Sequence, residues 1–213
     1  MKIGLCICLS YNVLVKFFIV LISFSAVLYP LFVWYGRVGG SLSLDATLAL
    51  NVFPAFGLLA FAVMWLHVVG GAMRDALEKH FNFQKFVDLS SIVVLVSLLF
   101  HPLLLVAGIG VRNFGLVFDY NDPKYIWLAI FAWFILVGYD VLKRFKKRDF
   151  FMRHWETIKL ISTIGFFLTF FHSIGVGTDL ATGAPRYVWF FYGVSAGVAA
   201  IYTYGVKKFL KRG

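Results

Sequence analysis

Two histidines lie in the middle of apolar runs, His101 in SLLFHPLLL (97–105) and His172 in FFLTFFHSI (166–174). A neutral imidazole is an axial ligand of haem iron, and two imidazoles on opposite sides of the ring hold a b-type haem. Ionisable side chains inside apolar segments are costly and usually have a partner or a function. Two interpretations are therefore open: ligation of one haem by both histidines, or a pair of buried histidines that each hydrogen-bond a carbonyl or hydroxyl group.

The composition indicates the medium in which these histidines lie. Of the 213 residues, 61% are hydrophobic and 14% are charged, and the mean hydropathy is +0.86. Soluble domains average roughly 45–50% apolar and about 25% charged residues. This shortage of polar residues excludes a water-soluble globule. It predicts an integral membrane protein in which residues 1–213 form a single transmembrane domain.

Six segments are long and apolar enough to cross a hydrocarbon core about 30 Å thick. Gly, Pro and polar residues cluster between them. Because a backbone in lipid must satisfy its own hydrogen bonds, the sequence predicts an all-α bundle of six membrane-spanning helices. The predicted spans are roughly residues 12–35, 49–72, 88–108, 124–143, 157–176 and 187–206.

The distribution of Lys and Arg predicts the orientation of this bundle. Loops rich in these residues face the cytoplasm, so both termini are expected there, in a multi-pass protein of the plasma (inner) membrane. The net charge of +10 lies beside span ends, so membrane lipid and not nucleic acid is the expected partner. The basic segments are 73–87, 143–153 and 207–212, and the segments with a single basic residue are 36–48, 109–123 and 177–186.

Two further residue types have ordinary explanations. Tryptophans near span ends are typical of interfacial anchors. Two cysteines near the N-terminus have no second pair for a zinc site and too little separation for an unstrained disulfide, so no structural role is expected. The tryptophans are Trp34, Trp127, Trp155 and Trp189, and the cysteines are Cys6 and Cys8.

The two histidines are expected at the same depth, since the third and fifth spans run in the same direction. Asp88 and Thr157 mark the cytoplasmic starts of these spans. At 1.5 Å per residue, the roughly 13 residues from Asp88 to His101 and the roughly 15 residues from Thr157 to His172 place both histidines about 20 Å from the cytoplasmic edge. Matching depth on parallel helices is what a bis-histidine haem requires.

Four segments of the chain carry a family resemblance. They are GLLAFAVMWLHVVGGAMRDALEKHF (57–81), HPLLL (101–105), F-x₃-W-x₃-K-x₁₂-H-S (151–173) and GVSAGVAAIYTYGVKKF (193–209). Together they are similar to the second, third, fifth and sixth helices of the ferric reductase-like transmembrane domain, which NADPH oxidases, iron reductases and the haem-containing membrane subunit of bacterial methionine-sulfoxide repair share. In that six-helix family the third and fifth helices each carry two histidines, thirteen or fourteen residues apart, which hold two stacked haems. The resemblance implies that the two histidines of this chain are the outer ligand pair.

The chain departs from the family pattern at the inner ligand pair. Lys159 stands at the first histidine position of the fifth helix. Asp88 or Val87 stands at that of the third helix, depending on whether the spacing to His101 is thirteen or fourteen. The resemblance therefore implies one haem b near the outer face, and no covalent flavin is evident.

The residues at the inner level allow three interpretations. Asp88 and Lys159 begin parallel helices, and His67 lies at nearly the same level on the second span. Asp88 and Lys159 could form an ion pair, or all three could form a quinone or proton site. Alternatively, Lys159 reaches the headgroups and Asp88 caps its helix.

Arg37, Arg112 and Arg186 are the lone basic residues of the three outer loops. An outer haem presents its propionates at that level, so Arg112 and Arg186 are candidate cofactor-binding residues. Contact with solvent or lipid headgroups is the alternative.

Two functions are consistent with these features. The first is an electron-transferring oxidoreductase subunit, in which one haem near the outer face passes electrons from a separate donor, a quinol or a flavoprotein, to an external acceptor protein or metal. The chain has no Gly-rich nucleotide loop, so a reductase is expected on another polypeptide or on another part of a longer product. The second is a non-redox membrane protein, such as a transport or assembly subunit, that keeps the six-helix fold without haem.

Overall fold

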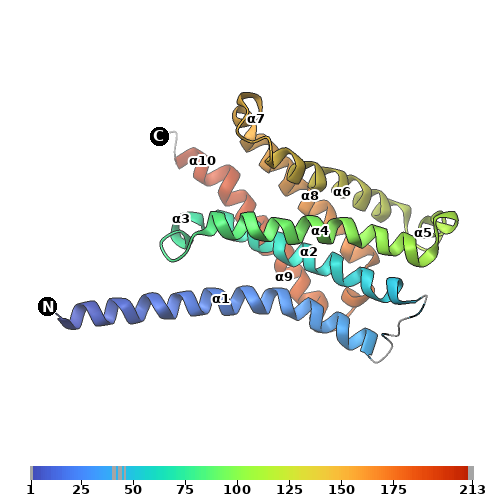
Figure 1. The fold of residues 1–213 in the computed structure, drawn as a ribbon, viewed down its shortest axis with the longest axis horizontal. Coiled ribbons are helices and arrows are strands. Elements are labelled where there is room, and N and C mark those ends of the chain that lie inside the picture. Colours follow the sequence, from blue (N-terminus) through green and yellow to red (C-terminus); the bar gives the residue numbers. More distant parts are fainter. Residues whose placement is uncertain (1, 40–41, 43–44, 46, 211–213) are drawn as a thin grey trace.

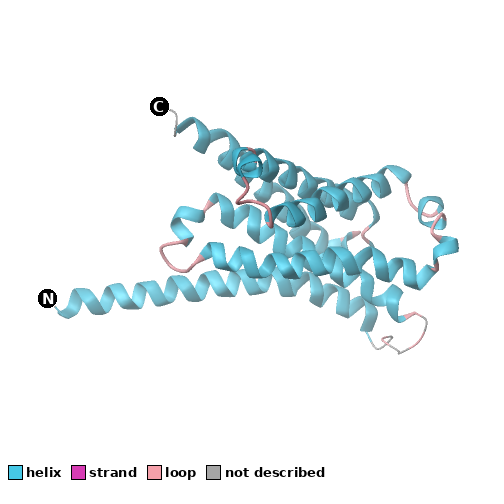
Figure 2. Cartoon of the chain, turned by 45° about the horizontal axis from the view of Figure 1, so that its top comes forward, coloured by secondary structure: helices cyan, strands magenta, loops and turns pink. Residues whose placement is uncertain are grey.

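The computed structural model describes residues 2–39, 42, 45 and 47–210, and of residues 2–12 it describes the backbone alone. The side chains of Cys6 and Cys8 therefore lie outside the described part. Throughout that part every regular element is a helix (Figures 1 and 2), which confirms the all-α prediction. The long helices are α1 (Lys2–Val38), α2 (Leu48–Ala72), α4 (Phe83–Ile109), α6 (Pro123–Lys143), α8 (Trp155–Val176) and α9 (Gly183–Ile201). The short ones are α3 (Arg74–Leu77), η2 (Val111–Asn113), α5 (Leu116–Asp119), α7 (Asp149–Arg153), η3 (Thr178–Leu180), the π-helical η4 (Tyr202–Val206) and α10 (Lys207–Leu210).

Five of the helices are long and apolar enough to cross a membrane: α1 from Val13 onward, α2, α4, α6 and α8. This finding supports the prediction of a multi-pass membrane protein. Within the described residues, α9 is not one of the five. It carries glycines, a serine and tyrosines among its apolar residues. The sixth crossing therefore stays a prediction.

The two histidine-bearing helices begin earlier than predicted. α4 starts at Phe83 instead of about residue 88, and α8 starts at Trp155 instead of about residue 157. Asn82 is the N-cap of α4, because its side chain accepts a hydrogen bond from the Lys85 amide at 2.7 Å. The suggestion that Asp88 caps this helix is therefore wrong, since Asp88 lies more than one turn inside it.

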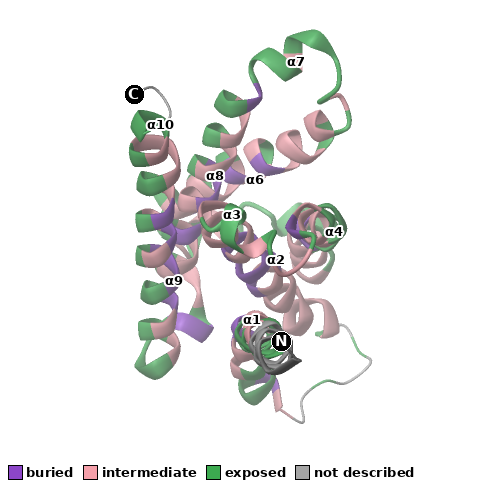
Figure 3. Ribbon diagram, turned by 90° about the vertical axis from the view of Figure 1, so that its left-hand side faces the viewer, coloured by how far each residue is buried: buried purple, intermediate pink, exposed green. Residues whose placement is uncertain are grey.

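α2 lies at the centre of the bundle and contacts α1, α4, α8 and α9, while α6 packs along α8. Phe61 of α2 is 1% exposed, and its ring stacks on Phe166 of α8 at 4.6 Å and on Trp189 of α9 at 4.4 Å between centroids. Figure 3 shows buried segments along the facing sides of α2 and α9. The expectation that Trp189 is an interfacial anchor is wrong, because α9 packs this ring into the core. Trp155 is buried as well.

A backbone carbonyl that a proline inside α1 leaves without its helical partner accepts a hydrogen bond from a side chain of another helix. Pro30 has no N–H, so the carbonyl of Ala26, four residues earlier, loses its helical partner. The Tyr192 hydroxyl of α9 donates to that carbonyl at 2.8 Å. In an apolar medium a freed backbone group must find another partner, and here the partner ties α9 to α1.

The segments that connect the long helices lie at two opposite ends of the bundle. Both chain ends, α3 and α7 lie toward one end, and α5 lies at the other (Figure 1). Near the latter end, Arg37 of α1 forms an ion pair with Asp179 of η3, whose side chain is 4% exposed. This pair fixes the end of α1 to the connection that precedes α9.

Candidate functional site

His101 and His172 lie at matching positions on α4 and α8. These helices begin at Phe83 and Trp155. At 1.5 Å per residue, the roughly 18 residues from Phe83 to His101 and the roughly 17 residues from Trp155 to His172 correspond to about 27 Å and about 26 Å along the helix axes. Both distances are larger than expected from the sequence, because the helices begin earlier than predicted.

The His101 ring is held by α2. Its Nδ1 lies 2.8 Å from the carbonyl oxygen of Phe53. A carbonyl only accepts hydrogen bonds, so Nδ1 carries the proton and Nε2 keeps its lone pair. Gly57 makes room for the ring: a Cβ at this position would lie 2.8 Å from Cε1 and 2.9 Å from Nδ1 of His101.

The His172 ring is held in the same way by α6. Its Nδ1 lies 2.9 Å from the carbonyl oxygen of Tyr125, in the first turn of that helix. The start of α6 is fixed by Asp122, whose side chain accepts a hydrogen bond from the Lys124 amide at 3.1 Å. The Lys124 ammonium also hydrogen-bonds this carboxylate and lowers the pKa of Asp122, so the cap stays ionised at neutral pH. The carbonyl that orients His172 is thus set by a capped helix end.

Both rings leave Nε2 available to a ligand. Neither Nε2 has a hydrogen-bond partner among the described residues. No buried side-chain nitrogen or oxygen in that part of the chain lacks a partner, so neither Nε2 is sealed off. A histidine with Nδ1–H on a carbonyl and a free Nε2 is the form that ligates a metal, so each of the two side chains has the form of a haem ligand.

Another proline inside a helix, Pro102, lies next to His101. Pro102 frees the carbonyl of Leu98 from its helical bond. The indole Nε1 of Trp133, on α6, donates to that carbonyl at 2.9 Å. The contact joins α6 to α4 one turn before His101.

The two predicted outer arginines lie in segments that follow the histidine-bearing helices α4 and α8. Arg112 is exposed in η2, directly after α4. Arg186 lies in the first turn of α9, where it donates to the carbonyl of Ala181 at 2.8 Å and covers the ring of Phe190 at 5.6 Å. The described structure gives neither arginine a carboxylate partner.

A polar cavity of about 390 Å³ lies at the other end of the same helices. It is bounded by α2, α4, α6, α8 and the C-terminal part of the α9–η4 segment. This size is within the range of small-molecule sites. Its titratable lining residues include His67, Tyr139, Asp140, Lys143, Lys159 and Tyr204.

The lining of this cavity separates the two candidate positions on α4, Val87 and Asp88. Lys159 lines it, as does Val87, whereas Asp88 is not a lining residue. On α4, therefore, the residue that faces this space is the one fourteen positions before His101.

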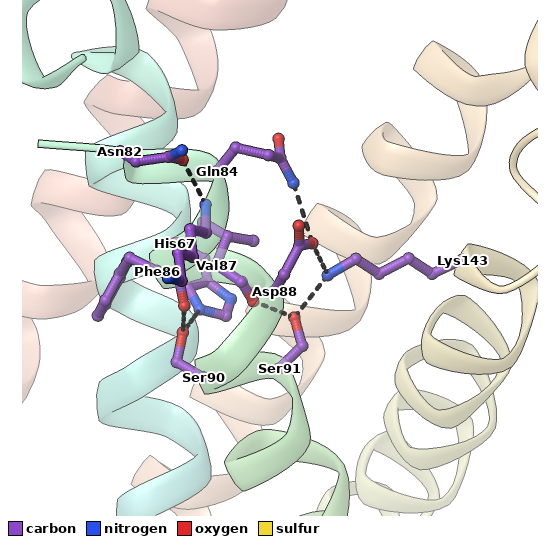
Figure 4. Close-up of polar contacts among 10 residues, drawn as sticks. His67, Asn82, Gln84, Phe86, Val87, Asp88, Ser90, Ser91 and Lys143 are labelled. Atoms are coloured by element: carbon purple, nitrogen blue, oxygen red, sulfur yellow. Dashed lines mark hydrogen bonds and ion pairs between the residues drawn. The ribbon is translucent and has the colours of Figure 1, made fainter.

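The expected ion pair between Asp88 and Lys159 is wrong. Asp88 pairs with Lys143 of α6 at 2.8 Å, and the same ammonium donates to Ser91 at 2.9 Å (Figure 4). Lys159 pairs with Glu156, one turn earlier on its own helix, at 2.6 Å. Because Asp88 lies inside α4, on the side next to α6, it does not face α8.

His67 is brought to the cavity wall by α2 and bonded to α4. Its Nε2 lies 2.7 Å from the Ser90 hydroxyl, which in turn donates to the carbonyl of Phe86 at 2.6 Å (Figure 4). With that hydroxyl proton on Phe86, His67 donates through Nε2 and keeps an unprotonated Nδ1. Of the predicted inner set, the structure thus brings His67 and Lys159 to one cavity and leaves Asp88 outside it.

Sequence reasoning missed Asp140. It lies in the predicted fourth span and lines the cavity next to Tyr139 and one turn before Lys143. The signal was present, since a carboxylate inside an apolar segment is costly and usually functional. The position of Tyr204, on η4, could not be predicted in this way, because its place at the cavity depends on how the last helix packs.

Comparison of this chain with protein-family models, with curated proteins and with solved structures found no match. Two groups of residues therefore carry the functional inference, the outer histidine pair and the inner cavity. No cluster of three or more His, Cys, Asp or Glu side chains suited to a metal ion occurs in the part of the chain that the structure describes.

Proposed function

We propose that this protein is a membrane electron carrier that holds one haem b between His101 and His172, as the resemblance to the ferric reductase-like domain implies. The observation that carries the proposal is the pair of Nδ1 bonds to backbone carbonyls, which fix each ring and leave Nε2 for iron. When bound, the haem supplies a one-electron couple.

The other residues of the outer site have supporting roles. Gly57 leaves space for the His101 ring. Arg112 and Arg186 are the proposed partners of the haem propionates, as donors of charge-assisted hydrogen bonds. Because Val87 and Lys159 replace the inner ligands, one haem is proposed and not two.

The proposed topology has six crossings, with α9 as the sixth and both termini in the cytoplasm of a cell with this protein in its plasma membrane. Its support is the concentration of basic residues in segments 73–87 and 143–153 and in the tail. A reporter fused after α10 should be active on the cytoplasmic side. Activity only on the outer side would contradict this topology.

The proposed electron path begins at a separate quinol or flavoprotein and ends at an external acceptor. The polar cavity offers ionisable groups from α2, α6, α8 and η4, and we propose that it takes up protons released by donor oxidation. His67 and Lys159 remain members of this proposed site. Asp140 replaces Asp88 in it, because Asp140 lines the cavity.

A haem-free membrane protein is the second candidate. The hydrogen bonds of His101 and His172 join α4 to α2 and α8 to α6, and such bonds stabilise helix packing without any cofactor. In that case each histidine would be structural only.

Absorbance spectroscopy of the purified protein tests the first proposal against the second. We expect a low-spin Soret band at one haem per chain, lost in His101→Ala and in His172→Ala. His154→Ala is the matched control, since this histidine lies at the C-cap of α7, outside the spans. His101→Gly should regain haem when imidazole is added, which a misfolded variant would not. A six-coordinate low-spin spectrum that survives in the double alanine variant would refute the assignment.

A further inference from the structure

A second, apolar space lies on the other side of the His67–Ser90 hydrogen bond. This groove, of about 660 Å³, runs between α1, α2, α3 and the start of α4. Its walls are aliphatic on the α1 side and aromatic at the inner end. The aromatic lining residues are Phe24, Trp65, Phe81, Phe83 and Phe86, and the polar ones are Lys16, Ser23 and Ser90.

The groove opens sideways toward the lipid-facing side of α1. Val20 and Phe24 line it, and their exposed fractions are 62% and 63%. Residues 13–24 of α1 are mostly exposed, and this part of the helix lies at the edge of the bundle (Figures 1 and 3). An apolar molecule dissolved in the bilayer can therefore enter without passing through water.

The groove and the polar cavity meet at one hydrogen bond. Ser90 lines the groove, and His67 lines the cavity. Their 2.7 Å contact connects the two spaces (Figure 4). The Ser90 oxygen contacts His67 and Phe86, which leaves one of its lone pairs for a donor in the groove.

We propose that this groove binds the ring of a lipid-soluble quinol, and that Ser90 and His67 pass its protons into the polar cavity. The proposal rests on the proposed function, of which it specifies the donor. A quinol has a ring for the aromatic end, an apolar tail for the α1 side and hydroxyl groups for Ser90. An acyl chain needs no hydroxyl partner, and a phosphate headgroup needs more cations than Lys16 alone.

Protons and electrons leave the quinol by different routes. Oxidation of a quinol to a quinone breaks two O–H bonds and releases two protons and two electrons. A haem held by His101 and His172 would accept these electrons one at a time, so one quinol would serve two reduction events. Proton transfer uses the other hydrogen-bond arrangement, in which the Ser90 hydroxyl turns from Phe86 to donate to Nε2 of His67 and the imidazole carries its proton on Nδ1. For each O–H bond broken, Ser90 then accepts the quinol proton while its own proton moves to Nε2, and His67 releases the Nδ1 proton into the cavity. The ring returns to the Nδ1–H form before the second proton is transferred.

The position of Ser90 shortens the electron path. Ser90 precedes His101 by about 11 residues on α4, or about 16 Å along the axis, whereas the start of α4 lies about 27 Å away. A donor in the groove is therefore closer to the outer histidine pair than any donor at the cytoplasmic end of the helix.

Binding of decylubiquinone and menaquinone-1 to the full-length protein tests the site. The readout is quenching of tryptophan fluorescence, because Trp65 lines the groove. Ser90→Ala should raise Kd about five- to tenfold, the equivalent of one hydrogen bond. Val20→Phe, which fills the mouth from an exposed position, should raise it by a similar factor. Ser91→Ala is the matched control, because this neighbour lines the cavity and not the groove, and its Kd should stay within about twofold of the native value.

A kinetic measurement tests the proton path separately from binding. His67→Phe should leave the quinone Kd within about twofold and slow reduction of the haem by decylubiquinol at least about tenfold, with dithionite reduction unchanged. The proposal is overturned if quenching does not saturate, if Ser90→Ala and Val20→Phe bind as the native protein does, or if a decyl-chain lipid without a ring competes equally. It is also overturned if His67→Phe is reduced at the native rate. Saturable quinone binding by a protein without a Soret band would instead refute the proposed haem function and leave the groove assignment standing.

Discussion

Removing the indole donor next to His101 should destabilise the protein more when Pro102 is present than when it is replaced. Trp133 Nε1 donates to the Leu98 carbonyl, which Pro102 has freed. Leu98 is 9% exposed, so in Trp133→Phe the carbonyl loses its donor in an apolar setting. A buried acceptor without a partner costs about 1–3 kcal/mol, and single interhelical hydrogen bonds in membranes average about 0.6 and reach about 1.7 kcal/mol. We therefore expect a loss of about 1–2 kcal/mol in the free energy of unfolding.

The double variant isolates the hydrogen bond from the change in packing. In Pro102→Ala the new backbone N–H can bond the Leu98 carbonyl, which no longer depends on the indole. Trp133→Phe in that background should cost about 1 kcal/mol less, and this difference is the coupling energy between the two positions. Trp127→Phe is the matched control, because Trp127 lies on the same helix, is 51% exposed and should lose less than about 0.5 kcal/mol.

The measurement is equilibrium unfolding in mixed micelles of increasing dodecyl sulfate fraction, followed by circular dichroism. Independent positions give additive effects to within about 0.3 kcal/mol. If Trp133→Phe costs the same, within that margin, in the native protein and in the Pro102→Ala variant, the freed carbonyl is not what the indole satisfies. The reasoning about proline and aromatic donors would then be refuted.

The other predictions use the same unfolding assay or the haem spectrum. Tyr192→Phe should cost about 1 kcal/mol, and less than half of that in a Pro30→Ala background, since the hydroxyl then has no freed carbonyl to satisfy; equal costs would contradict the pairing. Gly57→Ala should lower haem content at least about twofold by displacing the ligand ring, whereas Gly71→Ala on the same helix, with open space around it, should not. Arg37→Met should cost about 1–3 kcal/mol because it leaves a buried carboxylate unpaired; a loss below about 0.5 kcal/mol would show that the carboxylate finds another partner.

The sequence predicts the helices well because the medium constrains them. An apolar run in lipid has few alternatives to a helix, and each of the six predicted spans overlaps one of the long helices. The helix ends were harder to predict than the helices themselves, because α4 and α8 extend past the apolar residues into the polar connections. That shift of a few residues carried Asp88 from the end of α4 to its interior, and so to Lys143 instead of Lys159.

Partners across the bundle could not be predicted, because they depend on how the helices pack. Pro102 shows in the sequence that the Leu98 carbonyl is free, but not that Trp133 reaches it. Trp189 near a span end is typical of an interfacial anchor, and only the contact of α9 with α2 shows that it is buried. Asp140, by contrast, was predictable in principle, since a carboxylate in an apolar span needs an explanation.

One type of contact recurs in this bundle and includes both histidines. Side chains of Trp133, Tyr192, His101 and His172 each donate to a backbone carbonyl of a neighbouring helix. Two of these carbonyls are freed by prolines, and the other two accept from histidines through a second lone pair, which leaves the helical bond in place. The histidine bonds therefore cost the helices nothing and fix the tautomer that leaves Nε2 for iron. A glutamine at either position could keep the carbonyl bond through its amide and would offer iron no imidazole. The glutamine variants should thus retain more of the unfolding free energy than the alanine variants and bind no more haem, which separates the packing role of these residues from ligation.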